Sequence, residues 1–169
     1  QPYGTVGSTR VLPLEEGIGK IKAALSGRQD ASLVIAGRTS AASINGLDDA
    51  IERGRAYQAE GVDALFFTGV TAEDEVRAVS DALNIPVFLG GPGTGTLGDR
   101  EFLARHGVRI SLQGHHPFMA SVQATYETLK SLRNGASPED IIGKASSEFM
   151  NTVTCADDYQ RRMKEYLGG

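Results

Sequence analysis

The sequence predicts an α/β fold in which short parallel strands alternate with helices. Four apolar runs, residues 33–36, 64–67, 86–89 and 108–112, have the length of buried strands. Amphipathic segments with recognisable helix ends separate them, so that a strand is followed by a helix four times. Because continuous apolar runs are typical of parallel strands covered on both faces, we expect one parallel sheet with right-handed crossovers.

The first helices each have a signal at one end. A helix before the first strand covers residues 14–25, and the next begins near Leu47 and ends before Gly61, a residue type that favours helix C-termini. Thr71 followed by Asp74 predicts a capping box at the start of the third helix.

The later helices are also marked by capping residues. Asp99 predicts the start of a short helix, and a longer amphipathic helix follows Pro117. Beyond that helix no further apolar run of strand length follows. Ser137 and Pro138 instead form a new helix start, and a last amphipathic segment comes after them. We therefore expect two regions, residues 1–135 and 136–169.

Composition excludes several classes of function. Lys and Arg number 17 against 21 Asp and Glu, a formal net charge of −4, which argues against a nucleic-acid surface or a polybasic membrane anchor. No apolar run approaches the roughly 18 residues of a membrane span, and no signal segment opens the sequence, so a cytoplasmic protein is expected. The single cysteine, Cys155, excludes an internal disulfide and a multi-cysteine zinc site.

Two architectures are compatible with four βα units. One is a small open sheet with helices on both faces. The other is part of an eight-stranded βα barrel, which normally needs about 250 residues, so that four units cannot close it alone. In both architectures a ligand binds at the carboxyl ends of the strands.

Candidate site residues follow the first and fourth strands. Arg38 ends the first, where its guanidinium could clamp a carboxylate or form a structural ion pair. Gln113 and the adjacent His115 and His116 follow the fourth, where one histidine could act as a general acid or base. No carboxylate directly follows any of the four strands, so the sequence shows no obvious site for a hard cation.

The motifs taken together resemble the isocitrate lyase / phosphoenolpyruvate mutase superfamily. The resemblance rests on "LVIAGRTSA" from Leu33, "GLDDAIER" from Gly46 and "GVDALF" from Gly61, and it continues through "PVFLGG", "GVRISLQGH" and "ATYETL". It implies a (β/α)8 TIM-barrel fold of which this chain supplies strands five to eight. Residues 1–10 would be the remnant of a gating loop, and the helices of residues 136–169 would pack or exchange in a homodimer or tetramer.

The resemblance also assigns roles to residues. Arg38 matches the arginine that binds the carboxylate and oxyanion of an α-keto acid. His115 matches the histidine of the oxaloacetate decarboxylase branch, and we prefer it to His116. The further residues expected to contact substrate are Gln113 and, in the gating loop, Tyr3 and Gly4. Mg²⁺ is implied as cofactor, with ligands on the first four strands and none in this chain.

The implied reaction is the Mg²⁺-dependent decarboxylation of oxaloacetate or a similar α-keto acid. Family lyases carry a Lys-Cys-Gly-His element in the gating loop and a glutamate after strand six, whereas this chain has Pro2-Tyr3-Gly4 and Thr68-Gly69. These departures disfavour, without excluding, a 2-methylisocitrate lyase or a phosphonopyruvate-type lyase. A third possibility is a half-barrel that does no chemistry without its missing partner half.

Overall fold

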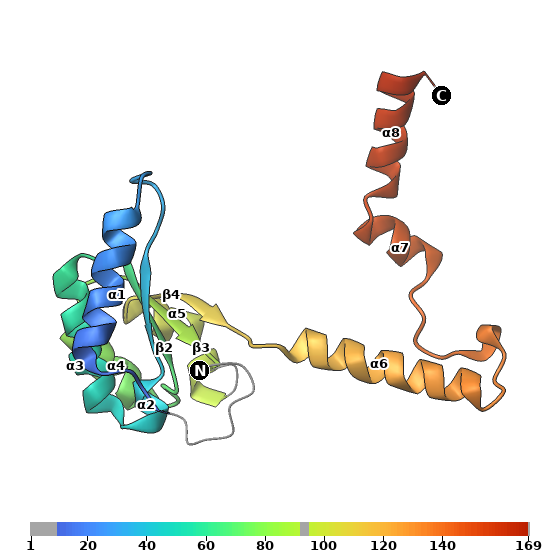
Figure 1. The fold of residues 1–169 in the computed structure, drawn as a ribbon. Helices are drawn as coiled ribbons and strands as arrows, with labels where there is room; N and C mark the ends of the chain where they lie inside the picture. The colour runs from blue at the N-terminus through green and yellow to red at the C-terminus, as the bar shows by residue number, and fades with distance from the viewer. Residues whose placement is uncertain (1–9, 92–94, 169) are drawn as a thin grey trace. The chain divides into compact units, whose positions relative to one another are not determined.

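The computed structural model describes residues 10–91 and 95–168 (Figure 1). The chain divides into two compact units, with the boundary between Gly114 and His115. The first contains a sheet and its helices, and the second contains helices only. The predicted division into residues 1–135 and 136–169 concerned the roles of the two parts in an assembled barrel, and it stays a prediction.

The four predicted strands all form, and each pairs in parallel with the next one along the chain. The sheet has the order β1-β2-β3-β4. Three strands agree with their apolar runs to within one residue. The bounds are β1 (Ala36–Thr39), β2 (Ala64–Thr68), β3 (Val87–Gly90) and β4 (Val108–Leu112).

The first strand begins later than its apolar run predicted. Residues 33–34 are exposed, and pairing with β2 starts at Ala36. Asp63, directly before β2, accepts hydrogen bonds from the N–H of Ile35 at 2.8 Å and from Arg28 at 2.7 Å. These bonds fix the point at which the chain enters the sheet.

Helices cover one face of the sheet in the part of the chain that is described; Figure 1 shows α1, α3 and α4 gathered on one side. Leu65, Phe67 and Leu89 point to the covered face and are at most 1 % exposed, whereas Ile110 and Leu112 on the other face are each 44 % exposed. The helical elements are α1 (Leu14–Gly27), α2 (Ala41–Ile44), α3 (Leu47–Glu60), α4 (Glu73–Ala82), η1 (Gly95–Gly98) and α5 (Arg100–Arg105).

This one-sided coverage separates the two architectures. A doubly wound sheet carries helices on both faces. In a βα barrel the second face of every strand points into the closed interior and receives no helix. The strand order and the single helical layer therefore match consecutive units of a barrel, as predicted. The expectation that both faces would be covered is not met by residues 10–91 and 95–114.

The predicted capping box of α4 names the wrong acidic residue. Glu75, not Asp74, completes the cap of α4: its Oε2 accepts the N–H groups of Thr71 at 2.6 Å and of Ala72 at 3.1 Å. Ala72 is the residue before the helix, so Glu75 occupies the third helical position, from which a carboxylate reaches back to the chain entering the helix. Asp99 is confirmed as the cap of α5.

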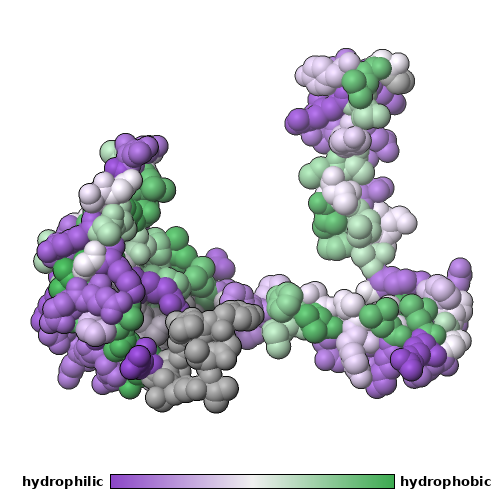
Figure 2. All heavy atoms as spheres, viewed as in Figure 1, coloured by the Kyte–Doolittle hydropathy of each residue, from purple (hydrophilic) through white to green (hydrophobic). Residues whose placement is uncertain are grey.

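The second unit exposes much apolar surface. Ser137 starts only a single 3₁₀ turn, and the sequence patterns did not predict α7. Phe118 and Tyr126 on α6 are 65 % and 58 % exposed, and Figure 2 shows apolar patches on these helices. The described helices include none long and apolar enough to cross a membrane. The elements are α6 (His116–Arg133), η2 (Pro138–Asp140), α7 (Ser147–Val153) and α8 (Ala156–Leu167).

We predict that Asp63→Asn destabilises the protein at neutral pH and much less in acid. The Ile35 N–H, opposed by desolvation and helped by Arg28, holds the pKa of Asp63 below its usual 3.8. Because the folded pKa is depressed, the stabilisation is complete above the pKa of the unfolded chain and is lost as the pH falls through the folded value.

The measurement is the free energy of urea unfolding at pH 7, 5 and 3. The difference between native protein and Asp63→Asn should stay constant from pH 7 to 5 and shrink at pH 3. Asp81→Asn is the control, because the exposed Asp81 accepts no hydrogen bond and makes no ion pair within the described part of the chain. A difference for Asp63→Asn that does not change with pH would contradict the prediction.

Candidate functional site

Arg38 lies near the carboxyl end of the sheet on the face that the helices leave open. Along β1 the side chains alternate, so that Gly37 and Thr39 are buried and Arg38 is exposed. A Cβ added at Gly37 would lie 3.0 Å from the ring of Tyr57 on α3, so the glycine lets this ring pack directly on the strand. Opposite Arg38 in the register is Phe66, whose ring centroid lies 5.4 Å from the guanidinium carbon.

The guanidinium of Arg38 has no salt-bridge partner among residues 10–91 and 95–168. Arg53 is the contrast. It is buried, its Nε lies 3.0 Å from Asp49, and it donates to the carbonyl of Leu12 at 2.8 Å. Burial works against its charge, but the Asp49 carboxylate prevails and the pKa of Arg53 is raised. Arg53 is thus a structural ion pair, while Arg38 keeps donors for an external carboxylate.

Two hydroxyl side chains join the carboxyl ends of β1 and β2. Thr68 Oγ1 donates to Ser40 Oγ over 2.8 Å. The ends of β1 and β2 therefore each carry a neutral hydroxyl. A carboxylate at either position would compete with an external anion for the Arg38 guanidinium. The sequence patterns showed the lack of acids but not this pair. This hydrogen bond could have been inferred from the sequence, because Ser40 and Thr68 follow or end two strands that were predicted to be adjacent and parallel.

A hollow of about 380 Å³ opens at the carboxyl end of β1. Arg10, Arg38 and Arg53 lie in its wall beside Ser40, and no acidic side chain is among the described residues that line it. Because Asp49 neutralises Arg53, the charge of the other two arginines gives the wall a net positive potential. An anion is the ligand that such a hollow attracts.

The structure places the other predicted site residues differently. Gln113 directly follows β4 and is exposed, at the same end of the sheet as Arg38 but beyond the opposite edge strand. His115 precedes α6 in the second unit, where it makes no side-chain cap, and His116 is the first residue of that helix. Tyr3 and Gly4, which the resemblance assigned to a gating loop, lie outside the described residues.

The residues present at the strand ends do not fit a magnesium ion. Magnesium is bound through carboxylates and water, whereas Arg38, Ser40 and Thr68 offer a cation and two neutral hydroxyls. Within residues 10–91 and 95–168 no group of three or more His, Cys, Asp or Glu side chains is arranged to hold a metal. The chemistry that this end of the sheet supports by itself is anion binding.

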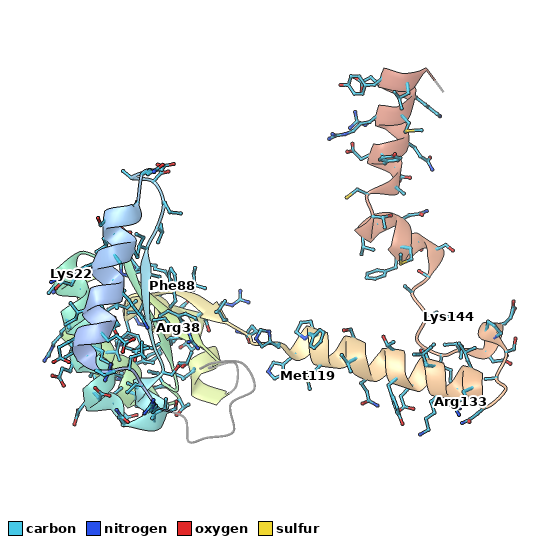
Figure 3. The ribbon with its side chains drawn as sticks, in the orientation of Figure 1. Lys22, Arg38, Phe88, Met119, Arg133 and Lys144 are labelled. Carbon is cyan, nitrogen blue, oxygen red and sulfur yellow. The ribbon has the colours of Figure 1, made fainter. Side chains whose placement is uncertain are left out.

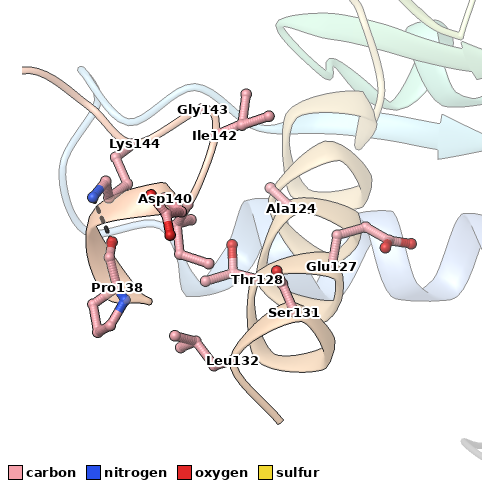
Figure 4. Close-up of a pocket in the computed structure, with 11 residues that line it drawn as sticks. Ala124, Glu127, Thr128, Ser131, Leu132, Pro138, Asp140, Ile142, Gly143 and Lys144 are labelled. Atoms are coloured by element: carbon pink, nitrogen blue, oxygen red, sulfur yellow. Dashed lines mark hydrogen bonds between the residues drawn. The ribbon is translucent and has the colours of Figure 1, made fainter. Parts of the chain in front are cut away.

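A larger hollow, of about 550 Å³, belongs to the second unit and lies between α6 and residues 138–144 (Figure 4). Two of its charged side chains already have local partners. Lys144 Nζ donates to the carbonyls of Pro138 at 2.5 Å and Glu139 at 3.2 Å, and Glu127 on α6 accepts from Gln123 at 2.9 Å. This hollow is the space between a helix and the segment that turns back on it, and we assign no chemistry to it.

The chain is similar to curated enzymes over nearly its whole length. It is 48 % identical over 168 residues to an oxaloacetate decarboxylase of Bradyrhizobium sp. (strain ORS 278), a match that covers 99 % of this chain and 58 % of that protein. It is 50 % identical over 168 residues to an oxaloacetate decarboxylase of Rhodopseudomonas palustris (strain HaA2), covering 99 % and 57 %. The chain thus spans less than two thirds of the length of these relatives.

Solved structures have the same fold in part of their chains. Phosphoenolpyruvate phosphomutase from Streptomyces platensis subsp. rosaceus matches with a TM-score of 0.71 at 21 % identity, covering 97 % of this chain and 58 % of that one. Phosphonopyruvate hydrolase in complex with oxalate and Mg²⁺ matches with a TM-score of 0.73 at 26 % identity, covering 99 % and 60 %.

A family model described as phosphoenolpyruvate phosphomutase matches residues 4–133, a range that contains all four strands and Arg38. A 2,3-dimethylmalate lyase, a member of the PEP mutase/isocitrate lyase superfamily, matches with a TM-score of 0.74 at 20 % identity, covering 92 % of this chain and 56 % of that one. The chain therefore belongs to the phosphoenolpyruvate phosphomutase family, and its sheet is part of a βα barrel.

Proposed function

We propose that the complete protein decarboxylates oxaloacetate, and that this chain supplies the part of the barrel that binds a substrate carboxylate. The observation that carries the proposal is the Arg38 guanidinium, which points to the open face of the sheet without a salt bridge in the described part of the chain. Relatives 48 % to 50 % identical across nearly all of the chain are named for this reaction, which supports oxaloacetate as the substrate.

The reaction needs a fixed carboxylate and a stabilised anion. When the C–C bond to the departing CO₂ breaks, its electron pair passes into an enolate, and a proton added to the enolate carbon gives pyruvate. Arg38 binds the carboxylate that stays and offsets the negative charge that develops on the adjacent oxygen. His115 orients the substrate or delivers the proton. Gln113, Tyr3 and Gly4 complete the contacts with substrate.

The proposal includes a cofactor and an assembly. The Mg²⁺ that accompanies oxalate in the phosphonopyruvate hydrolase structure supports a magnesium requirement, with ligands outside this chain. The apolar side chains exposed on α7 and α8, among them Phe149, Tyr159 and Tyr166, support packing or exchange of residues 136–169 in a homodimer or tetramer. A cytoplasmic location fits a small α-keto acid substrate, and we propose no nucleic-acid or membrane partner.

The proposal predicts the substrate and metal dependence of the complete protein. Pyruvate formation from oxaloacetate, followed by a coupled assay, should exceed the background rate, should stop when EDTA removes divalent ions, and should return with Mg²⁺. The same preparation should leave 2-methylisocitrate and phosphonopyruvate unchanged. Turnover of either compound in preference to oxaloacetate would replace the proposal with a lyase or phosphonopyruvate reaction. No turnover of any of the three compounds would overturn the proposed function.

Arg38→Ala in the complete protein should lower kcat/KM for oxaloacetate by more than tenfold, because a charge-assisted hydrogen bond contributes roughly 1.5–3 kcal/mol. Arg55→Ala is the matched control, since Arg55 is exposed on α3 and lies away from the strand ends. An unchanged rate for Arg38→Ala would remove this residue from the site.

Replacement of His115 and His116 one at a time tests which histidine takes part. His115→Gln should lower kcat by more than tenfold, because general acid or base catalysis contributes about 10²–10⁴ in rate. His116→Gln should change kcat by less than threefold. The reverse order of the two effects would assign the role to His116, and no effect from either would exclude both.

A further inference from the structure

Phe66 lies between Arg38 and Gly90 on the open face of the sheet. Arg38 on β1 is its register partner, and the guanidinium carbon lies 5.4 Å from the ring centroid. On the other side, a Cβ added at Gly90 of β3 would lie 2.8 Å from Cε2 and 3.0 Å from Cζ of the ring. The ring, together with the methyl group of Thr68 at 2.9 Å from the same point, therefore occupies the space that a side chain at Gly90 would fill. Figure 3 labels Arg38 and Phe88 on these strands.

This contact holds the guanidinium without using its hydrogen-bond donors. The face of an aromatic ring attracts a cation through its quadrupole, while the N–H groups of the guanidinium point outward in its own plane. A carboxylate partner, such as Asp49 beside Arg53, would instead take up those donors. Within the described residues Arg38 has the ring and no carboxylate, so its donors stay available for an anion.

We propose that Phe66 is the positioning residue of Arg38. Its ring holds the guanidinium at the carboxyl end of the sheet and leaves the N–H groups for a substrate carboxylate, and the missing side chain of Gly90 provides the room for the ring. The inference rests on the proposed role of Arg38 in carboxylate binding, and it adds a residue that acts only through Arg38.

The first test is Phe66→Leu in the complete protein. The variant keeps a branched apolar side chain and removes the ring face, so kcat/KM for oxaloacetate should fall roughly three- to thirtyfold, mainly through a higher KM. Phe88→Leu is the matched control. It is the same substitution on the same face, one strand further from Arg38, and should change kcat/KM by less than threefold. An equal loss in both variants would overturn the proposal.

The second test asks whether Phe66 acts through Arg38. In an Arg38→Ala background, Phe66→Leu should have little further effect on kcat/KM, whereas independent roles would multiply the two losses. Gly90→Ala provides a different perturbation in case Phe66→Leu fails to fold. Its Cβ would meet the Phe66 ring, so Gly90→Ala should raise KM in the native protein and have little further effect on kcat/KM in an Arg38→Ala background. Multiplicative losses in either pair would overturn the proposal.

Calorimetric binding of oxalate in the presence of Mg²⁺ separates this inference from the proposed reaction. If the native protein binds oxalate without decarboxylating oxaloacetate, the proposed function fails. The inference then stands provided that Phe66→Leu weakens oxalate binding at least threefold and Phe88→Leu does not. If Phe66→Leu leaves the affinity unchanged, or if the native protein binds no oxalate, the inference fails whatever reaction the protein catalyses.

Discussion

The alternation of side chains along β1 is the constraint on which the site depends. Gly37 and Thr39 face the helical layer, and the ring of Tyr57 fits against the strand only because Gly37 has no Cβ. A shift of the strand by one residue would carry Arg38 into this packed layer and turn Thr39 to the open face. The packing of α3 against β1 therefore keeps a charged group on the face where a ligand can reach it.

Three arginines of the first unit show how the surroundings of a guanidinium decide its use. Arg28 is paired with Asp63 and helps to fix the start of β1. Arg53 is buried, paired with Asp49, and ties the carbonyl of Leu12 to α3. Arg38 rests on an aromatic ring and has no such partner in the described residues. Only the last arrangement leaves a binding surface for an outside anion.

Periodicity and capping signals predicted the four strands and most helices of the first unit, because these depend on local sequence, and the alternation of strands with helices predicted the parallel pairing. The start of β1 could not be predicted in this way. It is set by the carboxylate of Asp63, which is distant in sequence and reaches Ile35 only when β2 lies beside β1. The Ser40–Thr68 hydrogen bond and the contact of Phe66 with Arg38 were missed for the same reason, since both follow from the strand register.

The order of the sheet has a consequence for how this fold forms. Each strand pairs with its neighbour along the chain, so every pairing closes a loop of only about 20 to 30 residues, at a small and nearly equal entropy cost. Because these separations are similar, no pairing depends on closing a much longer loop, and the sheet can grow by one βα unit at a time. Among the described strands, β1 and β4 each keep one edge without a partner, and a further βα unit can therefore extend the sheet there without rearranging the pairs already made.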